Sequence, residues 1–288
     1  MKYALDNNAK VEATPDARGV CLCCGSELVA KCGSQKVWHW AHKSKKHCDH
    51  WWENETQWHR DWKNYFPQDW QEVVHFAADG EKHIADVKTP SGLVIEFQHS
   101  AINPDEQSSR ERFYKKMIWV VNGTRLKTDR EKFASLGWRT PNYYQRHEID
   151  WWDDFFPRKW RNRSVTVYFD TGNPEYLICV PKQGYAPNFY YVPKTLFGSE
   201  FCDVLNKFGD DFFVNRPAEY FINLMEQKFQ DALLEAKNDG IEYGTLAYKV
   251  RRSHHYALEK MGLSNKEINA YRKISSIQQV LQQAKQTK

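Results

Sequence analysis

The stretch HIADVKTPSGLVIEFQ, residues 83–98, decides which fold this chain is expected to adopt. Apolar residues flank a Thr-Pro-Ser-Gly turn, so the stretch predicts a β-hairpin with strands over 83–88 and 93–98. The first strand carries Asp86 and the second carries Glu96. On such a hairpin, their spacing is expected to bring the two carboxylates to the same end of one sheet.

These two acids are embedded in apolar strand sequence, where an unpaired charge is costly. If they converge they need a cation between them, and an ion that prefers oxygen ligands, such as Mg²⁺ or Mn²⁺, fits. Gln98 lies two residues beyond Glu96, on the same face of its strand, and is expected to orient a water on that metal. The alternative is that both acids face solvent at the strand ends.

The residues around the hairpin predict an α/β unit. Residues 51–66 (WWENETQWHRDWKNYF) have the three- and four-residue spacing of a helix that ends at Pro67. Glu55 on this helix is a candidate third carboxylate, and His59 and Lys63 lie one and two turns further along the same face. Further elements are expected at 73–77 (strand), 104–116 (helix) and 117–121 (strand). The order of helix, three strands, helix and strand is typical of an α/β unit.

The remaining sequence predicts a separate C-terminal region. Residues 164–169 and 176–180 are expected to form strands of a second small sheet. Amphipathic helices are expected over 216–239 and from Ser264 onward. We therefore expect three domains, over 1–50, 51–135 and 136–288, the last containing a small sheet followed by helices.

The first 50 residues contain a candidate zinc site. Cys21-x-x-Cys24 is followed by His39-x-x-His42, and two pairs of ligands, each on a tight turn, can close a tetrahedron around Zn²⁺. Four protein ligands leave no open position, so the zinc is expected to be structural. Nearby residues offer alternative ligands, namely Cys23, Cys32, His47, Cys48 and His50. The other interpretation is a set of buried cysteines and surface histidines.

Composition excludes several classes of protein. The 288 residues are 41% hydrophobic and 27% charged, which excludes a disordered chain. No apolar run approaches the roughly 20 residues of a membrane span, and the first ten residues lack the apolar block of a secretory signal. Without such a signal, the seven cysteines indicate a reducing cytoplasm and a metal site rather than disulfides.

The motifs together resemble a known family. Asp86 followed by Glu96-Phe97-Gln98 resembles the motif of the PD-(D/E)XK nucleases, with Gln in the place of Lys. The Cys and His pairs, the segment from Glu55 to Lys63 and the run from Ile95 to Ser100 resemble motifs of CoiA-like competence proteins. The resemblance covers roughly residues 18–123.

This resemblance implies a restriction-endonuclease-like α/β core, a mixed sheet flanked by helices, behind a zinc-finger-like module. It also implies a link to DNA uptake and recombination in competent bacteria. Cleavage would be metal-assisted phosphodiester hydrolysis, with the metal held by Asp86, Glu96 and the backbone carbonyl of Phe97. Gln98 would position the water, since an amide does not titrate, and Lys63 or His59 would neutralise phosphate charge or carry a proton.

We expect a metal-dependent deoxyribonuclease that acts on single- or double-stranded DNA in uptake, recombination, repair or phage defence. One alternative is a nuclease-fold DNA-binding protein that serves recombination without cutting. Another is a zinc-stabilised adaptor that binds protein partners, for example recombination or defence proteins. The sequence predicts no membrane partner and does not decide the oligomeric state.

The C-terminal tail generates a prediction about DNA binding. The chain's net charge is only +4, but residues 241–288 alone carry +6, with their tightest basic run at Lys249, Arg251 and Arg252. Replacing these three residues with Ala is expected to weaken DNA affinity and flatten its salt dependence, because each lost phosphate contact removes a released counterion. Titrations at several salt concentrations measure this slope. An unchanged slope would indicate a solvated surface.

Overall fold

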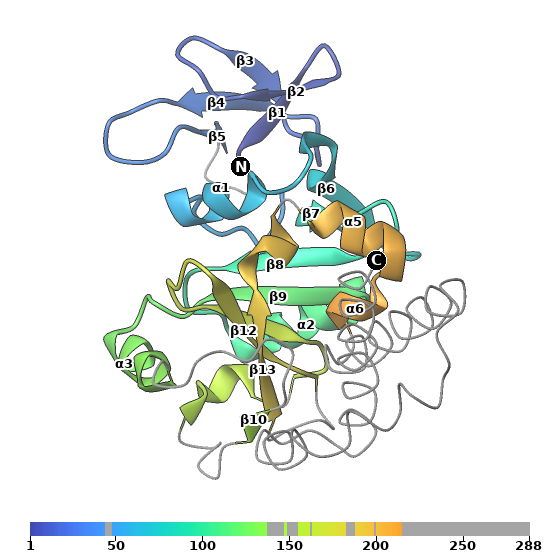
Figure 1. Cartoon of the computed structure of the whole chain (residues 1–288). Coiled ribbons are helices and arrows are strands. Elements are labelled where there is room, and N and C mark those ends of the chain that lie inside the picture. Colours follow the sequence, from blue (N-terminus) through green and yellow to red (C-terminus); the bar gives the residue numbers. More distant parts are fainter. Residues whose placement is uncertain are drawn as a thin grey trace, which may run out of the picture.

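The computed structural model describes residues 1–43, 48–136, 147–148, 155–161, 163–182, 188–198 and 200–214 (Figure 1). The helices expected over 216–239 and from Ser264 onward lie outside the described residues, as do Lys249, Arg251 and Arg252. In the part of the chain that is described, no helix has the length and apolar character needed to span a membrane.

The N-terminal module is a five-stranded sheet, which forms the blue region of Figure 1. Its strands pair antiparallel in the order β2-β1-β3-β4-β5. They span Tyr3–Asp6 (β1), Ala9–Glu12 (β2), Arg18–Val20 (β3), Glu27–Lys31 (β4) and His39–His42 (β5). The core of this module is small and includes Leu28 and Trp40 together with Cys21 and Cys23. A module with so few apolar residues would gain stability from a bound metal.

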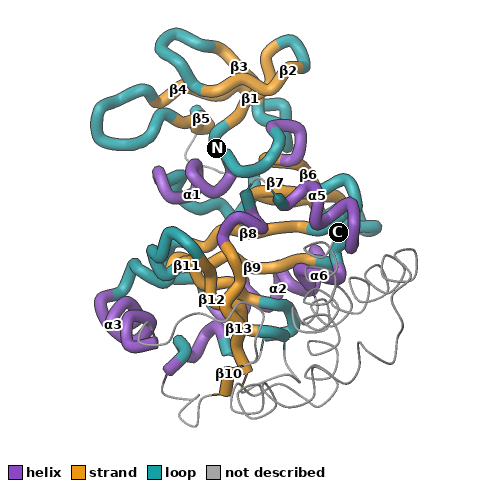
Figure 2. Tube along the Cα trace, viewed as in Figure 1, coloured by secondary structure: helices purple, strands orange, loops and turns teal. Residues whose placement is uncertain are grey.

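The second sheet has eight strands in the order β10-β13-β12-β11-β9-β8-β7-β6 (Figure 2). Its strands span Gln71–Phe76 (β6), Lys82–Lys88 (β7), Val94–Gln98 (β8), Met117–Asn122 (β9), His147–Glu148 (β10), Val167–Asp170 (β11), Tyr176–Val180 (β12) and Asn188–Pro193 (β13). The β8–β9 and β9–β11 pairs are parallel and the others are antiparallel. The sheet is therefore mixed, as predicted.

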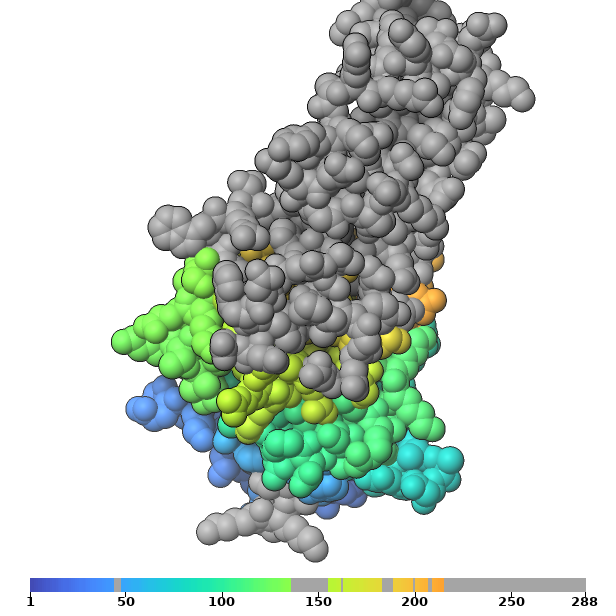
Figure 3. All heavy atoms as spheres, turned by 90° about the horizontal axis from the view of Figure 1, so that it is seen from below, coloured from blue at the N-terminus to red at the C-terminus, as the bar shows by residue number. Residues whose placement is uncertain are grey.

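Helices cover both faces of this sheet. They span Gln57–Lys63 (α1), Pro104–Tyr114 (α2), Lys127–Leu136 (α3), Phe201–Phe208 (α5) and Asp211–Val214 (α6), with 3₁₀ turns at Gln68–Trp70, Arg158–Trp160 and Lys194–Phe197. Alternate residues of β9 separate the two cores: Trp119 packs in the core that contains Tyr114 of α2, and Val120 packs in the core that contains Trp62 of α1. Seen from below, the green and yellow residues lie next to the blue residues of the N-terminal module (Figure 3).

The prediction that residues 164–169 and 176–180 form a second small sheet is wrong. β11 pairs in parallel with β9, with Tyr168 opposite Val120, and so continues the first sheet across the boundary expected at residue 135. The physical reason is burial: every residue of β11 and β12 is buried, so both strands need neighbours within a large sheet. The division of the chain into domains at 50 and 135 stays a prediction.

The first helix is shorter than predicted. It begins after Thr56, whose side chain caps the helix by accepting a hydrogen bond from the His59 amide, while the His59 ring accepts one from the Thr56 amide. The segment before Thr56 is not helical. Its side chains instead make buried contacts with the large sheet and with α1, and these contacts explain why Trp51 is inaccessible although it lies outside the helix.

Candidate functional site

Four metal-ligating side chains converge in the N-terminal module. Ligand atoms of Cys21, Cys24, His42 and Cys48 all lie within 4.8 Å of one another. Sγ of Cys21 is 3.6 Å from Sγ of Cys48, and Sγ of Cys24 is 3.4 Å from Nε2 of His42. Cys21 and Cys24 lie on a tight turn in which the Gly25 amide bonds the Cys21 carbonyl and Gly25 has φ +70°. This geometry supports a site that could bind zinc.

The thiols of this group fit a zinc ion chemically. Burial raises the pKa of Cys21 and of Cys48, because the charged thiolate loses its contact with water, and the neighbouring Cys21 sulfur raises the pKa of Cys48 further. Burial also acts to raise the pKa of Cys24, but hydrogen bonds from Ser26 and His42 lower it to about 6. A Zn²⁺ ion would supply the positive charge that the three sulfurs lack, in a closed set of three thiolates and one imidazole.

His39, which the sequence predicted as the third ligand, lies outside this group, and Cys48 takes its place. Residues His39–His42 form β5 rather than a tight turn. Side chains three positions apart on a strand project to opposite faces, so His39 and His42 do not converge. Nδ1 of His39 instead lies 2.8 Å from the Val37 carbonyl. The alternative that a nearby cysteine completes the site therefore describes the geometry better.

A second group that could hold a metal contains Asp49, His50 and His83. His83 is buried, with Nδ1 at 2.8 Å from Asp49 and Nε2 at 3.0 Å from Glu81. Burial acts to lower the pKa of His83, but these two carboxylates raise it. His83 is therefore better described as a histidine held between two carboxylates than as a metal ligand.

Asp86 and Glu96 meet where β7 and β8 separate. The backbone ladder between these strands ends at the Val87–Ile95 pair. Beyond it, the Asp86 amide donates to Oε1 of Glu96 (3.2 Å), and the Phe97 amide donates to Oδ2 of Asp86 (3.0 Å). The two carboxylates thus replace backbone carbonyls as acceptors and lie side by side between two strands.

Lys63 occupies the centre of the neighbouring acids. Its Nζ lies 3.1 Å from Glu55, 2.9 Å from Glu72 and 3.2 Å from Asp86. Burial acts to lower the pKa of Lys63, but these carboxylates hold it well above its usual value. The predicted residues Glu55, Lys63 and Asp86 are therefore brought together, with the lysine as the shared cation.

Glu72 is a member of this cluster that the sequence analysis missed. It is buried and accepts hydrogen bonds from the Lys2 amide (2.6 Å) and the Tyr3 amide (2.8 Å). It lies between Gln71 and Val73, whose partners on β7 are the two neighbours of Asp86. Burial acts to raise the pKa of Glu72, but Lys63 and the two amides lower it to about 2. Its φ of +47° is unusual for a residue other than Gly. The hairpin register, counted from the turn at 78–81, is the signal that could have identified it.

His59 and Gln98 are both held by Glu53, another residue that the sequence analysis missed. Oε2 of Glu53 lies 3.0 Å from Nε2 of Gln98 and 3.5 Å from Nε2 of His59, and its Oε1 accepts from the Ser100 amide at 2.6 Å. Burial acts to raise the pKa of Glu53, but hydrogen bonds from His59 and Ser100 lower it. His59 is thereby engaged at both ring nitrogens, because Nδ1 bonds Thr56.

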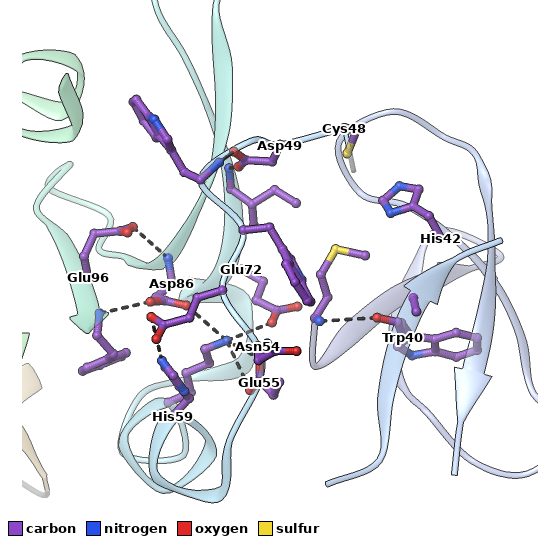
Figure 4. Close-up of a pocket in the computed structure, with 18 of the residues that line it drawn as sticks. Trp40, His42, Cys48, Asp49, Asn54, Glu55, His59, Glu72, Asp86 and Glu96 are labelled. Atoms are coloured by element: carbon purple, nitrogen blue, oxygen red, sulfur yellow. Dashed lines mark hydrogen bonds and ion pairs between the residues drawn. The ribbon is translucent and has the colours of Figure 1, made fainter. Parts of the chain in front are cut away.

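A pocket of about 80 Å³ lies between the carboxylates around Lys63 and the group of Cys21, Cys24, His42 and Cys48, here called the Cys/His cluster (Figure 4). One wall is formed by Trp40, Ala41, His42 and Cys48 of the N-terminal module. Six acidic side chains and two strongly basic ones line it, namely Asp49, Glu53, Glu55, Glu72, Asp86, Glu96, Lys63 and Arg110. The pocket is therefore net negative. Gln98 is not among its lining residues.

Asp86 and Glu96 are the groups of this pocket that could hold a divalent cation. Burial raises the pKa of Glu96 to about 8, with the charge of Asp86 contributing, although Arg110 opposes the shift. Arg110 donates to Oε2 of Glu96 at 2.8 Å. A pair of adjacent carboxylates with an excess of negative charge is the environment in which Mg²⁺ or Mn²⁺ binds through oxygen. Such an ion would stabilise the ionised form of Glu96.

Comparison with known proteins identifies one matching domain. Residues 6–50 match the family model of the N-terminal domain of the competence protein CoiA. This match confirms the resemblance to CoiA-like competence proteins that the motifs predicted, and it includes Cys21, Cys24, His42 and Cys48. No curated protein and no solved structure matches the chain.

The ligand set generates a prediction about zinc. Cys48→Ser is expected to reduce the metal content well below one zinc per chain, because it removes one of four converging ligands. His39→Ala, in the same module but outside the group, is expected to keep one zinc. Elemental analysis of the purified variants measures both. Zinc retained by Cys48→Ser and lost by His39→Ala would instead favour the ligand set expected from the sequence.

Glu96 generates a prediction about pH. Its pKa in the folded protein is about 8, against an ordinary value of 4.5, so the folded state binds the extra proton between these pH values. The stability that this proton provides is therefore present at low pH and lost as pH rises through that window. Glu96→Gln stays neutral at every pH and does not lose this stability. The Tm of the variant minus the Tm of the parent should therefore rise by about 2–4 °C or more from pH 5 to pH 9, which corresponds to a change of about 1 kcal/mol.

The matched control for this comparison is Glu131→Gln, at an exposed position on α3. Thermal unfolding followed at pH 5, 7 and 9 should give this control the same pH dependence as the parent. Equal pH dependence of Glu96→Gln and the parent would contradict the raised pKa.

Proposed function

We propose that this chain is a metal-dependent DNA nuclease with a restriction-endonuclease-like core and a competence-related role. The carrying observation is the adjacent pair Asp86 and Glu96, placed in a net-negative pocket at the point where β7 and β8 separate. The CoiA-type domain at residues 6–50 supports a competence-related function. The order α1, β6, β7, β8, α2, β9 is the order of helix, three strands, helix and strand that the sequence predicted for an α/β unit.

The charge of the pocket favours a metal-dependent reaction over simple DNA binding at this site. A phosphodiester carries negative charge, and the acidic side chains that line the pocket outnumber the basic ones. Phosphate would therefore be repelled unless a divalent cation bound first. Asp86, Glu96 and the Phe97 carbonyl are the groups that would hold this ion, which would supply a water of lowered pKa and compensating charge.

The other residues of the pocket would position these groups. Lys63 would keep Asp86 and Glu55 oriented, because its Nζ pairs with both. Arg110 would orient Glu96 through its hydrogen bond at 2.8 Å. His59 would hold Glu53 rather than exchange a proton, because both of its ring nitrogens are engaged.

A nuclease-fold DNA-binding protein without cleavage activity is the second candidate. One observation favours it: Lys63 already neutralises Asp86 at 3.2 Å, so a cation other than a metal is in place. The position of Gln98 favours it as well, because its amide is bound to Glu53 and does not line the pocket. In this alternative, DNA would contact another surface, for example the basic C-terminal tail.

The nuclease proposal predicts the effect of removing each carboxylate. Asp86→Ala or Glu96→Ala should abolish cleavage of single- and double-stranded DNA in Mg²⁺ or Mn²⁺, because each removes a ligand of the ion. Glu55→Ala should reduce the rate less, by about 10–100-fold, as expected for a residue that supports the ligands. Gln98→Lys should preserve activity, because Gln98 is bound to Glu53 and does not line the pocket. The rates are measured on labelled DNA, with Glu131→Ala as the exposed control.

Equal cleavage rates of Asp86→Ala and the parent would show that the activity does not arise at this pocket. Absence of cleavage by the parent, together with tight DNA binding, would favour the second candidate.

A further inference from the structure

Residues 48–55, here called the strap, connect the Cys/His cluster to the carboxylate pocket. Along the strap, inward and outward side chains alternate. His50, Trp52 and Asn54 are exposed, whereas Asp49, Trp51, Glu53 and Glu55 are buried or partly buried. The strap starts at Cys48, a ligand of the Cys/His cluster, and ends beside Lys63.

Asp49, the residue after Cys48, fastens the strap to β7. Its Oδ2 accepts a hydrogen bond from the Ile84 amide at 2.8 Å, two residues before Asp86. Its Oδ1 accepts from the Trp51 amide at 2.9 Å and lies 2.8 Å from Nδ1 of His83. One carboxylate therefore fixes both the path of the strap and the part of β7 that leads to Asp86.

Trp51 connects the strap to Glu96. Its ring stacks on His83 with the ring centroids 3.3 Å apart, and its carbonyl accepts a hydrogen bond from Arg110. The same guanidinium donates to Glu96 at 2.8 Å and lies over the Trp51 ring at 5.6 Å from its centroid. The orientation of Arg110, and with it that of Glu96, depends on the position of Trp51.

The two remaining inward residues complete the connection. Glu53 holds Gln98, Ser100 and His59, and Glu55 pairs with Lys63, which pairs with Asp86. Every strap residue that points inward thus contacts a group that touches Asp86 or Glu96, or a neighbour on the same strand. The strap, all of whose residues are described, forms no ladder with either sheet, so side-chain contacts and its end at Cys48 fix its path.

We propose that metal occupancy of the Cys/His cluster sets the geometry of the carboxylate pocket through the strap, with Asp49 as the positioning residue. Metal ligation fixes Cys48 and therefore places Asp49 against Ile84. Loss of the metal frees the strap at its start, and because metal-binding energy is local folding energy, this loosening reaches β7. The effect on DNA cleavage rests on the proposed function, whereas the structural coupling does not.

The first experiment measures amide hydrogen exchange of the full chain before and after zinc removal with a chelator. The amides of Ile84, Trp51 and Ser100 are bonded to strap carboxylates and should exchange at least tenfold faster without zinc. Amides of β12, far along the sheet, should keep their rates. Unchanged exchange at Ile84 and Trp51 in zinc-free protein overturns the proposal.

The second experiment replaces Asp49 in the zinc-loaded protein and so removes the hydrogen bonds between the strap and β7. Asp49→Ala should retain one zinc per chain, raise the exchange rate of the Ile84 amide at least tenfold and lower kcat for DNA cleavage. Asp49→Asn should give an intermediate exchange rate and kcat, because its amide oxygen still accepts one hydrogen bond. The control is Asp79→Ala, which removes a carboxylate that accepts the Glu81 amide in the β6–β7 turn. Exchange at β12 separates this effect from general destabilisation, because a purely global loss would raise exchange there too.

The outcomes distinguish the two ideas. If the parent never cuts DNA but exchange at Ile84 follows zinc and Asp49, the coupling stands and the nuclease proposal fails. If the parent cuts DNA and zinc-loaded Asp49→Ala matches it in kcat and in Ile84 exchange, the coupling is wrong and the nuclease proposal stands. Zinc loss from Asp49→Ala itself would show that Asp49 supports the metal site rather than transmitting its state, which also overturns the proposal.

Discussion

The buried ammonium of Lys63 is the interaction on which the rest of the site depends. It pairs with Glu55 before α1, Glu72 of β6 and Asp86 of β7, and so joins three segments of the chain at one point. Charged groups removed from water are stable only when they are paired and hydrogen-bonded. Without this cation, three carboxylates would face one another in a buried space, and the elements that carry them would separate.

Glu72 extends this cluster to the N-terminal module. The hydrogen bonds that it accepts from the backbone amides of Lys2 and Tyr3 attach the beginning of β1 to the large sheet. The pocket is consequently built from both parts of the chain, with Trp40 and His42 on one side and Asp86 and Glu96 on the other. A module that was predicted as a separate zinc-binding unit therefore also forms one wall of the acidic pocket.

The two candidate metal sites offer different ligand atoms. The Cys/His group offers three sulfurs and one imidazole, which suit Zn²⁺. The carboxylate pocket offers oxygens, which suit Mg²⁺ or Mn²⁺. The strap lies between them, and its alternation of inward and outward residues lets one short segment contact the surroundings of both sites. The unusual φ of Glu72 adds local strain at the same place, as is common near functional sites.

The sequence by itself determined the elements and pairings that follow from local pattern. The hairpin spacing placed Asp86 and Glu96 at the same end of one sheet, because the register of two strands joined by a short turn follows from counting residues from the turn. The Cys21–Cys24 turn followed from local chemistry in the same way.

Tertiary structure decided what depends on residues distant in sequence. β11 joins β9 rather than a new sheet, because its fully buried face needs a neighbour that local pattern does not specify. Cys48 replaces His39, because only the observed strand conformation of residues 39–42 places the two histidines on opposite faces. Glu53 and Glu72 are ordinary acids in the sequence and acquire their roles from partners that folding brings to them, namely Gln98, Lys63 and the first amides of the chain.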